Sequence, residues 1–68
     1  MKKKIDFYPS TEAEILGFNI DGSVRCDLFG EVKGEPYVSR GVSFPVDSPV
    51  LHLTEEEIAQ VKRETEKT

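Results

Sequence analysis

A thiol and an imidazole together can perform nucleophilic catalysis, and this sequence has one of each, Cys26 and His52. A catalytic thiol needs a partly exposed setting that favours the thiolate, with a base within reach. The alternation of the segment VRCDLFGEV instead places Cys26 on the apolar face of a strand, where a thiol behaves as a small hydrophobic group. His52 lies between two leucines in a short extended stretch, and we expect its side chain to be exposed. The sequence therefore predicts no catalytic pair.

Metal and cofactor sites are not expected either. One cysteine and one histidine cannot form an internal disulfide or the usual four-ligand zinc site. The acidic run 55–57 is explained by its place at the start of a helix, and the DGS stretch at Asp21 lacks the further ligands of a calcium loop. The sequence contains no glycine-rich dinucleotide motif, P-loop or HExxH motif. We therefore predict a non-enzymatic protein without cofactor or metal.

One face of the expected sheet carries the side chains most suited to binding a partner. Phe29 and Tyr37 stand at the alternate strand positions that point away from the expected core, and Arg25 lies on the same face. Ile20 is expected at an exposed loop tip. Arg40 interrupts the apolar parity of its strand. It binds a carboxylate of a partner, turns outward at a bulge with the following glycine, or lays its aliphatic stem along the sheet with its charged end in water. The candidate partner-binding residues are Phe29, Tyr37, Arg40, Arg25 and Ile20.

Two kinds of function fit these residues. Aromatic and arginine side chains are favoured anchors of protein–protein interfaces. Aromatic side chains with basic neighbours on a sheet also bind single-stranded nucleic acid. Asp27 and Glu31 alternate with Arg25 and Phe29, however, and their carboxylates repel phosphate. The sequence therefore favours a protein partner, such as one to which a small accessory or inhibitor protein binds, over nucleic acid. A homo-oligomer that pairs exposed sheet edges or the helix ends is a third hypothesis.

Composition and charge further narrow the kinds of partner that the protein is expected to bind. The 68 residues include 13 acidic and 9 basic side chains, which gives a net charge of −4 and a pI near 4.9. This balance disfavours duplex DNA or RNA, whose phosphates repel an acidic surface. No stretch is apolar over the length needed to cross a membrane, and the first lysines are not followed by the apolar segment of an export signal. We expect one small cytoplasmic domain that does not bind membranes.

Short strands separated by glycine and proline must position these residues. Two-residue alternation predicts strands over about residues 3–8, 13–19, 23–32 and 37–46. A capping pattern at Thr11 and Glu14 allows one helical turn over 11–17 instead, but a hairpin needs a first arm, so we prefer the strand. To keep Val32 and Val38 on one face, the next connection needs an odd length or a bulge, for which Gly41 is a natural site. The apolar face is assigned Leu16, Phe18, Val24, Cys26, Leu28, Val32, Val38, Val42, Phe44 and Val46.

The loop in FNIDGSV decides which side chains share a face. A two-residue turn at Asp21 and Gly22 sends Phe18 to the face opposite Val24, because a register slip of one residue reverses a strand. A three-residue loop that begins at Ile20 avoids this, with the glycine in the left-handed position of a bulge. We predict this loop. The expected pairs are Asn19 with Ser23, Phe18 with Val24, and Leu16 with Cys26.

The chain is expected to end in a helix over about residues 55–66. Thr54 and Glu57 form a capping box, and the acidic first turn suits the helix dipole. Every residue beyond Val61 is polar, so the last turn and a half is expected to fray. The predicted fold is α+β, a small antiparallel meander of three or four strands with one C-terminal helix packed on its apolar face. A half-open small barrel with a helix is the alternative.

Overall fold

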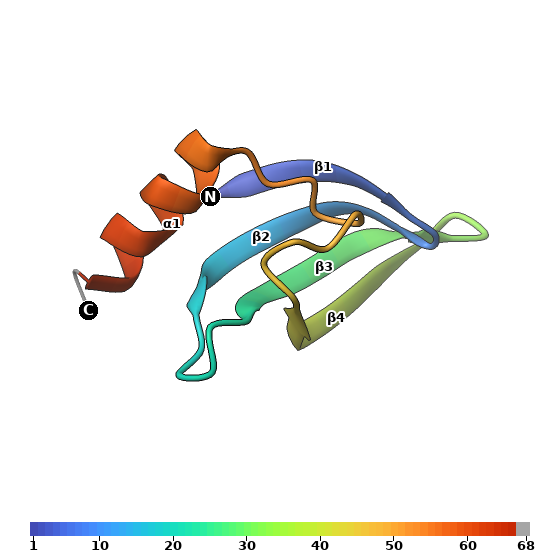
Figure 1. Ribbon diagram of the computed structural model, residues 1–68. Helices are drawn as coiled ribbons and strands as arrows, with labels where there is room; N and C mark the ends of the chain where they lie inside the picture. Colours follow the sequence, from blue (N-terminus) through green and yellow to red (C-terminus); the bar gives the residue numbers. More distant parts are fainter. Residues whose placement is uncertain (67–68) are drawn as a thin grey trace.

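The computed structural model describes residues 1–66, which form four strands followed by one helix (Figure 1). Each strand pairs antiparallel with the next, in the order β1-β2-β3-β4. The sheet is open, so the α+β meander is confirmed and the half-open barrel is not formed. The elements are β1 (Lys2–Phe7), β2 (Ser10–Phe18), β3 (Val24–Val32), β4 (Glu35–Phe44) and α1 (Glu55–Glu66).

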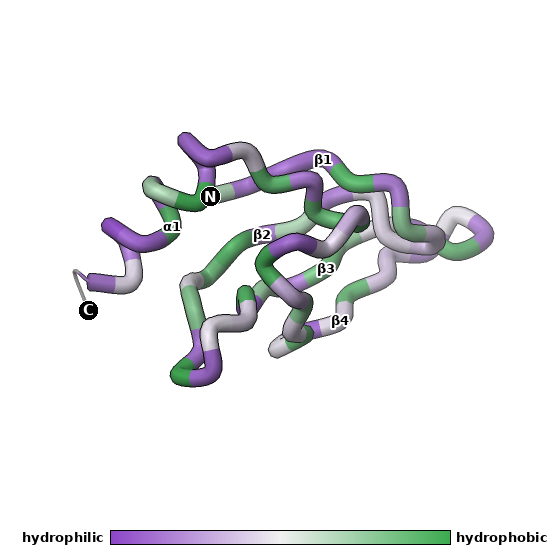
Figure 2. The backbone as a smooth tube through the Cα atoms, in the orientation of Figure 1, coloured by the Kyte–Doolittle hydropathy of each residue, from purple (hydrophilic) through white to green (hydrophobic). Residues whose placement is uncertain are grey.

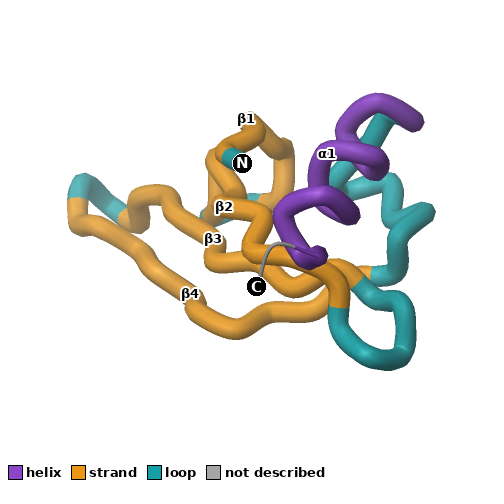
Figure 3. Tube along the Cα trace, turned by 90° about the vertical axis from the view of Figure 1, so that its left-hand side faces the viewer, coloured by secondary structure: helices purple, strands orange, loops and turns teal. Residues whose placement is uncertain are grey.

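The core lies between the sheet and a cover formed by α1 and the preceding 45–54 segment. Both parts of the cover lie on the same side of the sheet (Figures 1 and 3). Hydrophilic residues dominate β1, whereas hydrophobic stretches of β2 and β3 lie toward the middle of the sheet (Figure 2). Removal of these apolar side chains from water is the main favourable term in folding. The buried hydrophobic residues are Ala13, Ile15, Val24, Cys26, Leu28, Leu51 and Val61.

The β2–β3 connection is the predicted three-residue loop. The Asn19 N–H donates to the Ser23 carbonyl at 2.8 Å, and the Gly22 N–H donates to the Asn19 carbonyl at 3.0 Å. Gly22 has a φ of 88°, the left-handed conformation that glycine adopts without steric cost. Ile20 stands at the tip with a relative exposure of 109%. The loop brings Phe18 opposite Val24, as expected.

A bulge in β2 changes the side on which Leu16 lies. Ile15 pairs with Cys26, and Gly17 pairs with Arg25, so Leu16 is an extra residue between two regular pairs. Ile15 is buried and Leu16 is 42% exposed. The prediction that Leu16 lies opposite Cys26 in the core is therefore wrong. A bulge adds one residue to one strand, and the alternation before it is shifted by one position.

The connection from β3 to β4 is a two-residue turn. Lys33 and Gly34 both have positive φ, 51° and 83°, which defines a tight type I′ hairpin turn. Regular pairing continues from this turn to Leu28 opposite Ser39. This register places Val38 on the face away from the cover, where it is 48% exposed. The assignment of Val38 to the core is therefore wrong.

The predicted bulge at Gly41 is present. Leu28 pairs with Ser39 and Cys26 with Val42, so Arg40 and Gly41 together oppose one residue of β3. Gly41 has a φ of 69°. After the bulge, the side chains of β4 point to the faces that the sequence predicts, and Val42 and Phe44 pack against the core.

The strand β2 begins earlier than expected, at Ser10, so the helical turn at 11–17 is not formed. A turn at Tyr8 and Pro9, joined by a cis peptide bond, precedes it. This turn lies directly against Gly30. A β-carbon at Gly30 would meet the Pro9 carbonyl oxygen and lie 2.8 Å from the Ser10 Cα. Gly30 is therefore required by the close approach of two backbones.

The helix α1 begins with the predicted capping box. The Thr54 N–H donates to Glu57 Oε1 at 2.8 Å, and the Glu57 N–H donates to Thr54 Oγ1 at 3.2 Å. Lys3 of β1 also donates to Glu57 Oε1, at 2.6 Å, and to the His52 carbonyl. This set of contacts fixes the start of α1 against β1.

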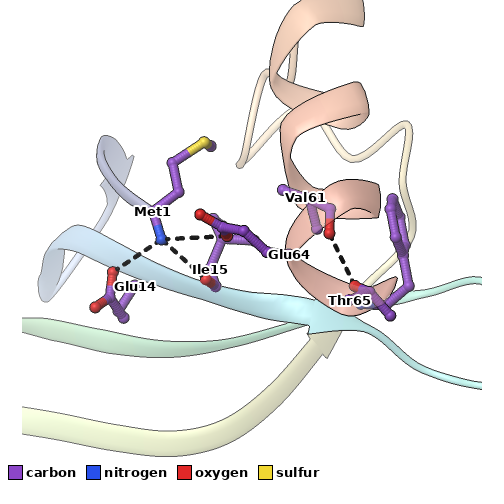
Figure 4. Close-up of polar contacts among 7 residues, drawn as sticks. Met1, Glu14, Ile15, Val61, Glu64 and Thr65 are labelled. Carbon is purple, nitrogen blue, oxygen red and sulfur yellow. Dashed lines mark hydrogen bonds and ion pairs between the residues drawn. The ribbon is translucent and has the colours of Figure 1, made fainter. Parts of the chain in front are cut away.

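The far end of α1 is attached to the sheet by polar groups, although it lacks apolar residues. Thr65 Oγ1 accepts a hydrogen bond from the Phe18 N–H at 3.0 Å, and Glu64 lies 3.7 Å from the Met1 ammonium (Figure 4). The helix continues to Glu66, and the expected fraying of its last turn and a half stays a prediction. Residues 67 and 68, on which that prediction also fell, lie outside the described residues.

Candidate interaction surface

The structure separates the two aromatic residues that the sequence placed on one face. Phe29 pairs with Val38 on the outer face, which is the face away from α1, whereas Tyr37 pairs with Gly30 on the side of the core. Both aromatic side chains are half-buried. The prediction of a shared Phe29 and Tyr37 patch is therefore wrong. The prediction assumed that inward and outward side chains alternate regularly along all of β4, without a shift at the Gly41 bulge. Tyr37 and Val38 were therefore each assigned to the wrong face of the sheet.

Arg40 turns outward at the bulge and contacts its own sheet. Its side chain is 74% exposed, and Nη1 lies 3.5 Å from Asp27 Oδ2. The other carboxylate oxygen, Oδ1, accepts a hydrogen bond from the Gly41 N–H at 2.9 Å. Asp27 thereby stabilises the bulge and also partly neutralises Arg40. The outward turn of Arg40 at the bulge is confirmed, and its contact with a partner's carboxylate stays a prediction.

Ile20 and Arg25, in contrast, lie at the same end of the sheet and adjoin exposed apolar groups. We define the hairpin-end surface as Leu16, Phe18, Ile20 and Arg25. A groove of about 340 Å³ runs beside Leu16, Phe18 and Arg25, and an open hollow of about 600 Å³ adjoins it at Ile20. Figure 2 shows a hydrophobic segment between hydrophilic neighbours at the tip of the β2–β3 loop. Sequence reasoning missed Leu16 and Phe18 because both were assigned to the core.

Side-chain hydrogen bonds hold the loop that carries this surface. Asn19 Nδ2 donates to the hydroxyls of Ser23 at 2.8 Å and Ser43 at 2.9 Å, which ties the loop to β4. The Ser23 N–H and hydroxyl both donate to Asp21 Oδ1. These hydrogen bonds lower the pKa of the exposed Asp21 carboxyl below its ordinary value. Ile20 therefore projects from a loop with a fixed shape.

The groove lies where β2 extends beyond its neighbour β1. Pairing of β1 begins at Lys2 with Glu14, and the Met1 carbonyl accepts from the Ile15 N–H. Residues 16–19 continue past this point, and the end of α1 lies beside them through Thr65. The N–H groups of Phe18 and Asn19 already donate to Thr65 and Ser23. These two backbone donors are therefore not available to a partner.

Arg25 is the cation of this surface. The ion pairs and side-chain hydrogen bonds formed among residues 1–66 include none made by its guanidinium. Its nearest carboxylates along the chain are engaged elsewhere, Asp21 with Ser23 and Asp27 with Arg40 and Gly41. Arg25 is also exposed. Its five N–H donors are accordingly available to an acceptor on another molecule.

A second groove of about 420 Å³ lies at the opposite end of the outer face and contains Phe29. Tyr8, with a relative exposure of 82%, lines it together with the carboxylates of Glu12 and Glu31. Tyr8 was not among the predicted residues, since its place before a turn proline gives no sign of function. Two carboxylates and no basic residue line this groove, so it does not suit phosphate.

The structure gives no support for catalysis at the residues considered from the sequence. Burial raises the pKa of the Cys26 thiol to about 11, which opposes formation of a thiolate at neutral pH. The His52 side chain is exposed, as expected. Within residues 1–66, no group of three His, Cys, Asp or Glu side chains is placed to hold a metal ion. Nor is any helix in this part of the chain long and apolar enough to span a membrane.

Both edges of the sheet carry features that oppose pairing with another strand. The β1 edge contains three consecutive lysines, Lys2–Lys4, and a register shift after Lys4. The β4 edge contains Pro36, which lacks an N–H, and the Arg40–Gly41 bulge. Charges, proline and bulges on edge strands are common means of preventing edge-to-edge association. These features argue against a homo-oligomer formed by strand pairing.

Comparison of the chain with protein-family models, with curated proteins and with solved structures finds no match.

Proposed function

We propose that this chain is a small non-enzymatic module that binds a larger protein through the hairpin-end surface. The observation that carries this proposal is the fully exposed Ile20 at the tip of a hydrogen-bonded loop, beside the exposed Leu16 and Arg25. A single exposed hydrophobic residue is common and needs no explanation. Two exposed aliphatic side chains next to an exposed arginine form the kind of cluster that anchors interfaces. The fixed loop also lowers the entropy lost on binding.

The single-stranded nucleic-acid hypothesis receives less support. It depends on aromatic side chains that share a face with several cations. Phe29 and Tyr37 lie on opposite faces, and Arg40 lies close to Asp27. The groove beside Phe29 is lined by carboxylates. We therefore retain a protein as the proposed partner, in keeping with an accessory or inhibitor role.

The test compares affinity capture by variants of the chain from a lysate of the organism that encodes it. The double variant Leu16→Ser, Ile20→Ser removes the exposed apolar groups of the hairpin-end surface. The matched control is Val38→Ser. The relative exposure of Val38, 48%, is close to the 42% of Leu16, but Val38 lies on β4 at the other end of the outer face. Loss of an interface anchor costs more than about 1 kcal/mol, so loss of two anchors lowers the affinity by about thirtyfold or more.

The expected result is a partner that the unchanged chain and the Val38 variant both retain and that the double variant loses. Circular dichroism of each variant must match that of the unchanged chain, so that loss of binding is not loss of folding. Equal capture by all three proteins would contradict the proposal. Light scattering at high protein concentration measures the homo-oligomer separately, and a dimer that the double variant abolishes would identify a second copy as the partner.

A further inference from the structure

The groove beside Arg25 combines an apolar lining with one charged group. Its lining residues are Leu16, Gly17, Phe18, Asn19, Arg25 and Thr65, and of these Arg25 alone is charged. We infer that this groove binds a carboxylate that stands next to an apolar side chain on the protein partner, with Arg25 as the group that recognises the carboxylate. This inference rests on the proposed function and adds the chemistry of the bound segment to it.

The charge of the partner follows from the contrast between two arginines on the same face. Arg40 has the Asp27 carboxylate 3.5 Å away, whereas Arg25 makes no ion pair with the residues that the structure describes. A planar guanidinium donates two parallel hydrogen bonds to a carboxylate, which makes an unengaged arginine a selective binding site for that group. Charge complementarity therefore indicates an acidic group on the occupant.

The lining selects an apolar neighbour for that acidic group. Leu16 is 42% exposed, and Phe18 is half-buried between the core and the groove. Gly17 adds no side chain between them, so the groove stays open along β2. Contact with an aliphatic side chain removes this apolar surface from water. A segment with a leucine-like side chain beside an aspartate, a glutamate or a terminal carboxylate matches both features.

The number of cations distinguishes this occupant from nucleic acid. Proteins that bind a phosphate backbone neutralise several phosphates with a series of lysines and arginines. The groove offers a single arginine, and the adjoining hollow includes the ionised Asp21, whose pKa is lowered by Ser23. One carboxylate needs one cation and can approach from the side of Leu16, away from Asp21. The observations thus favour a protein segment.

The experiment uses isocaproate as a probe, since it carries a carboxylate and the branched end of a leucine side chain. Amide chemical shifts of the ¹⁵N-labelled chain are followed by NMR while isocaproate, or its uncharged analogue isocaproamide, is titrated through the millimolar range. We expect saturable shifts at residues 16–19 and 25 with isocaproate. Isocaproamide is expected to bind more weakly by up to about fivefold, the upper end for one exposed ion pair.

Two variants test the role assigned to the guanidinium. Arg25→Gln is expected to weaken isocaproate binding by about fivefold, whereas Arg40→Gln is expected to leave it unchanged. Equal binding of isocaproate and isocaproamide, or equal binding by the Arg25 variant and the unchanged chain, would overturn the inference. Shifts of the same size and affinity with inorganic phosphate or with oligothymidylate would overturn it in favour of a general anion site.

This test and the capture test fail independently. If Leu16→Ser, Ile20→Ser abolishes capture but Arg25→Gln retains it and isocaproate does not bind, the proposed function stands and the carboxylate inference is wrong. If isocaproate binds through Arg25 but the captured partners do not depend on Leu16 and Ile20, the groove is a carboxylate site and the proposed function is wrong.

Discussion

Thr65 attaches the last turn of α1 to the sheet, and replacing it by valine tests how that turn is held. Its hydroxyl accepts from the Phe18 N–H at 3.0 Å. The same hydroxyl donates to the Val61 carbonyl at 2.8 Å (Figure 4). Thr65→Val keeps the branched shape but removes both interactions. The Phe18 N–H, which is partly buried, then loses this acceptor. Leaving a buried donor without its partner costs about 1–3 kcal/mol.

That cost is large for a protein of this size. Native proteins are stable by about 0.05–0.15 kcal/mol per residue, which for 68 residues is roughly 3–10 kcal/mol. A loss of 1 kcal/mol lowers the melting temperature of a small domain by about 4–8 °C. We expect Thr65→Val to lower the free energy of unfolding in urea by about 1–3 kcal/mol, with an unchanged m-value. Threonine and valine have similar helix propensities, so the helix itself contributes little to the difference.

Amide hydrogen exchange locates the effect. The Phe18 amide is expected to exchange faster in Thr65→Val, because the acceptor of its hydrogen bond is gone. Thr65→Ser serves as the matched control, since it keeps the hydroxyl and loses one methyl group. A valine variant as stable as the unchanged chain, with an equally protected Phe18 amide, would refute this account of helix docking. So would a serine variant destabilised as much as the valine variant.

Two further substitutions test other close contacts. Gly30→Ala is expected to lower the free energy of unfolding by about 1–3 kcal/mol, because its β-carbon would meet Pro9 and Ser10; an unchanged urea midpoint would contradict this. The second test concerns Glu57, whose pKa is lowered chiefly by the hydrogen bond from Lys3. This ionised carboxylate stabilises the fold above its ordinary pKa of 4.5, and the stabilisation is lost as the pH falls through the lowered folded-state value. Lys3→Met is therefore expected to reduce the fall in stability between neutral pH and a pH of about 3, measured by urea unfolding; equal falls would contradict it.

The fold class and the FNIDGSV loop could be predicted because several local signals agree there. The alternation in β3 is unambiguous, and the glycine of the loop is needed at a positive φ, observed as 88°. Thr54 and Glu57 similarly mark the start of α1. Where a strand has one apolar parity and its turn has one fitting length, the sequence determines the register.

The candidate surface was predicted less well, because two strands contain apolar residues both at the positions that point toward the core and at those that point away from it. In β2, Ile15, Leu16 and Phe18 allow either face to be the inner one, and the bulge decides. In β4, Tyr37 and Val38 are adjacent, and the position of the Gly41 bulge determines which one faces the core side. The glycines suggested bulges, but a bulge reverses every assignment on one side of it, and the sequence alone does not say which side.

The end of α1 illustrates a different limit. Residues beyond Val61 are polar, and the sequence pattern for helix packing depends on apolar spacing. The contacts that hold this end are a hydroxyl at Thr65 and a carboxylate at Glu64, the latter 3.7 Å from the Met1 ammonium. Such contacts join segments more than forty residues apart in the chain, and periodicity within one element carries no information about them.

The bulge in β2 links the stability of this fold to its candidate surface. Because Leu16 is the extra residue, Ile15 enters the core while Leu16 is left exposed beside Arg25. The same bulge sets Gly17 against the end of α1, where a β-carbon would lie 2.9 Å from Thr65 Oγ1. The missing side chain at Gly17 thus leaves the space that the end of the helix occupies at Thr65. In a regular strand Ile15 and Phe18 would point to opposite faces, so the bulge is what lets both pack on the core while Leu16, the extra residue between them, stays exposed.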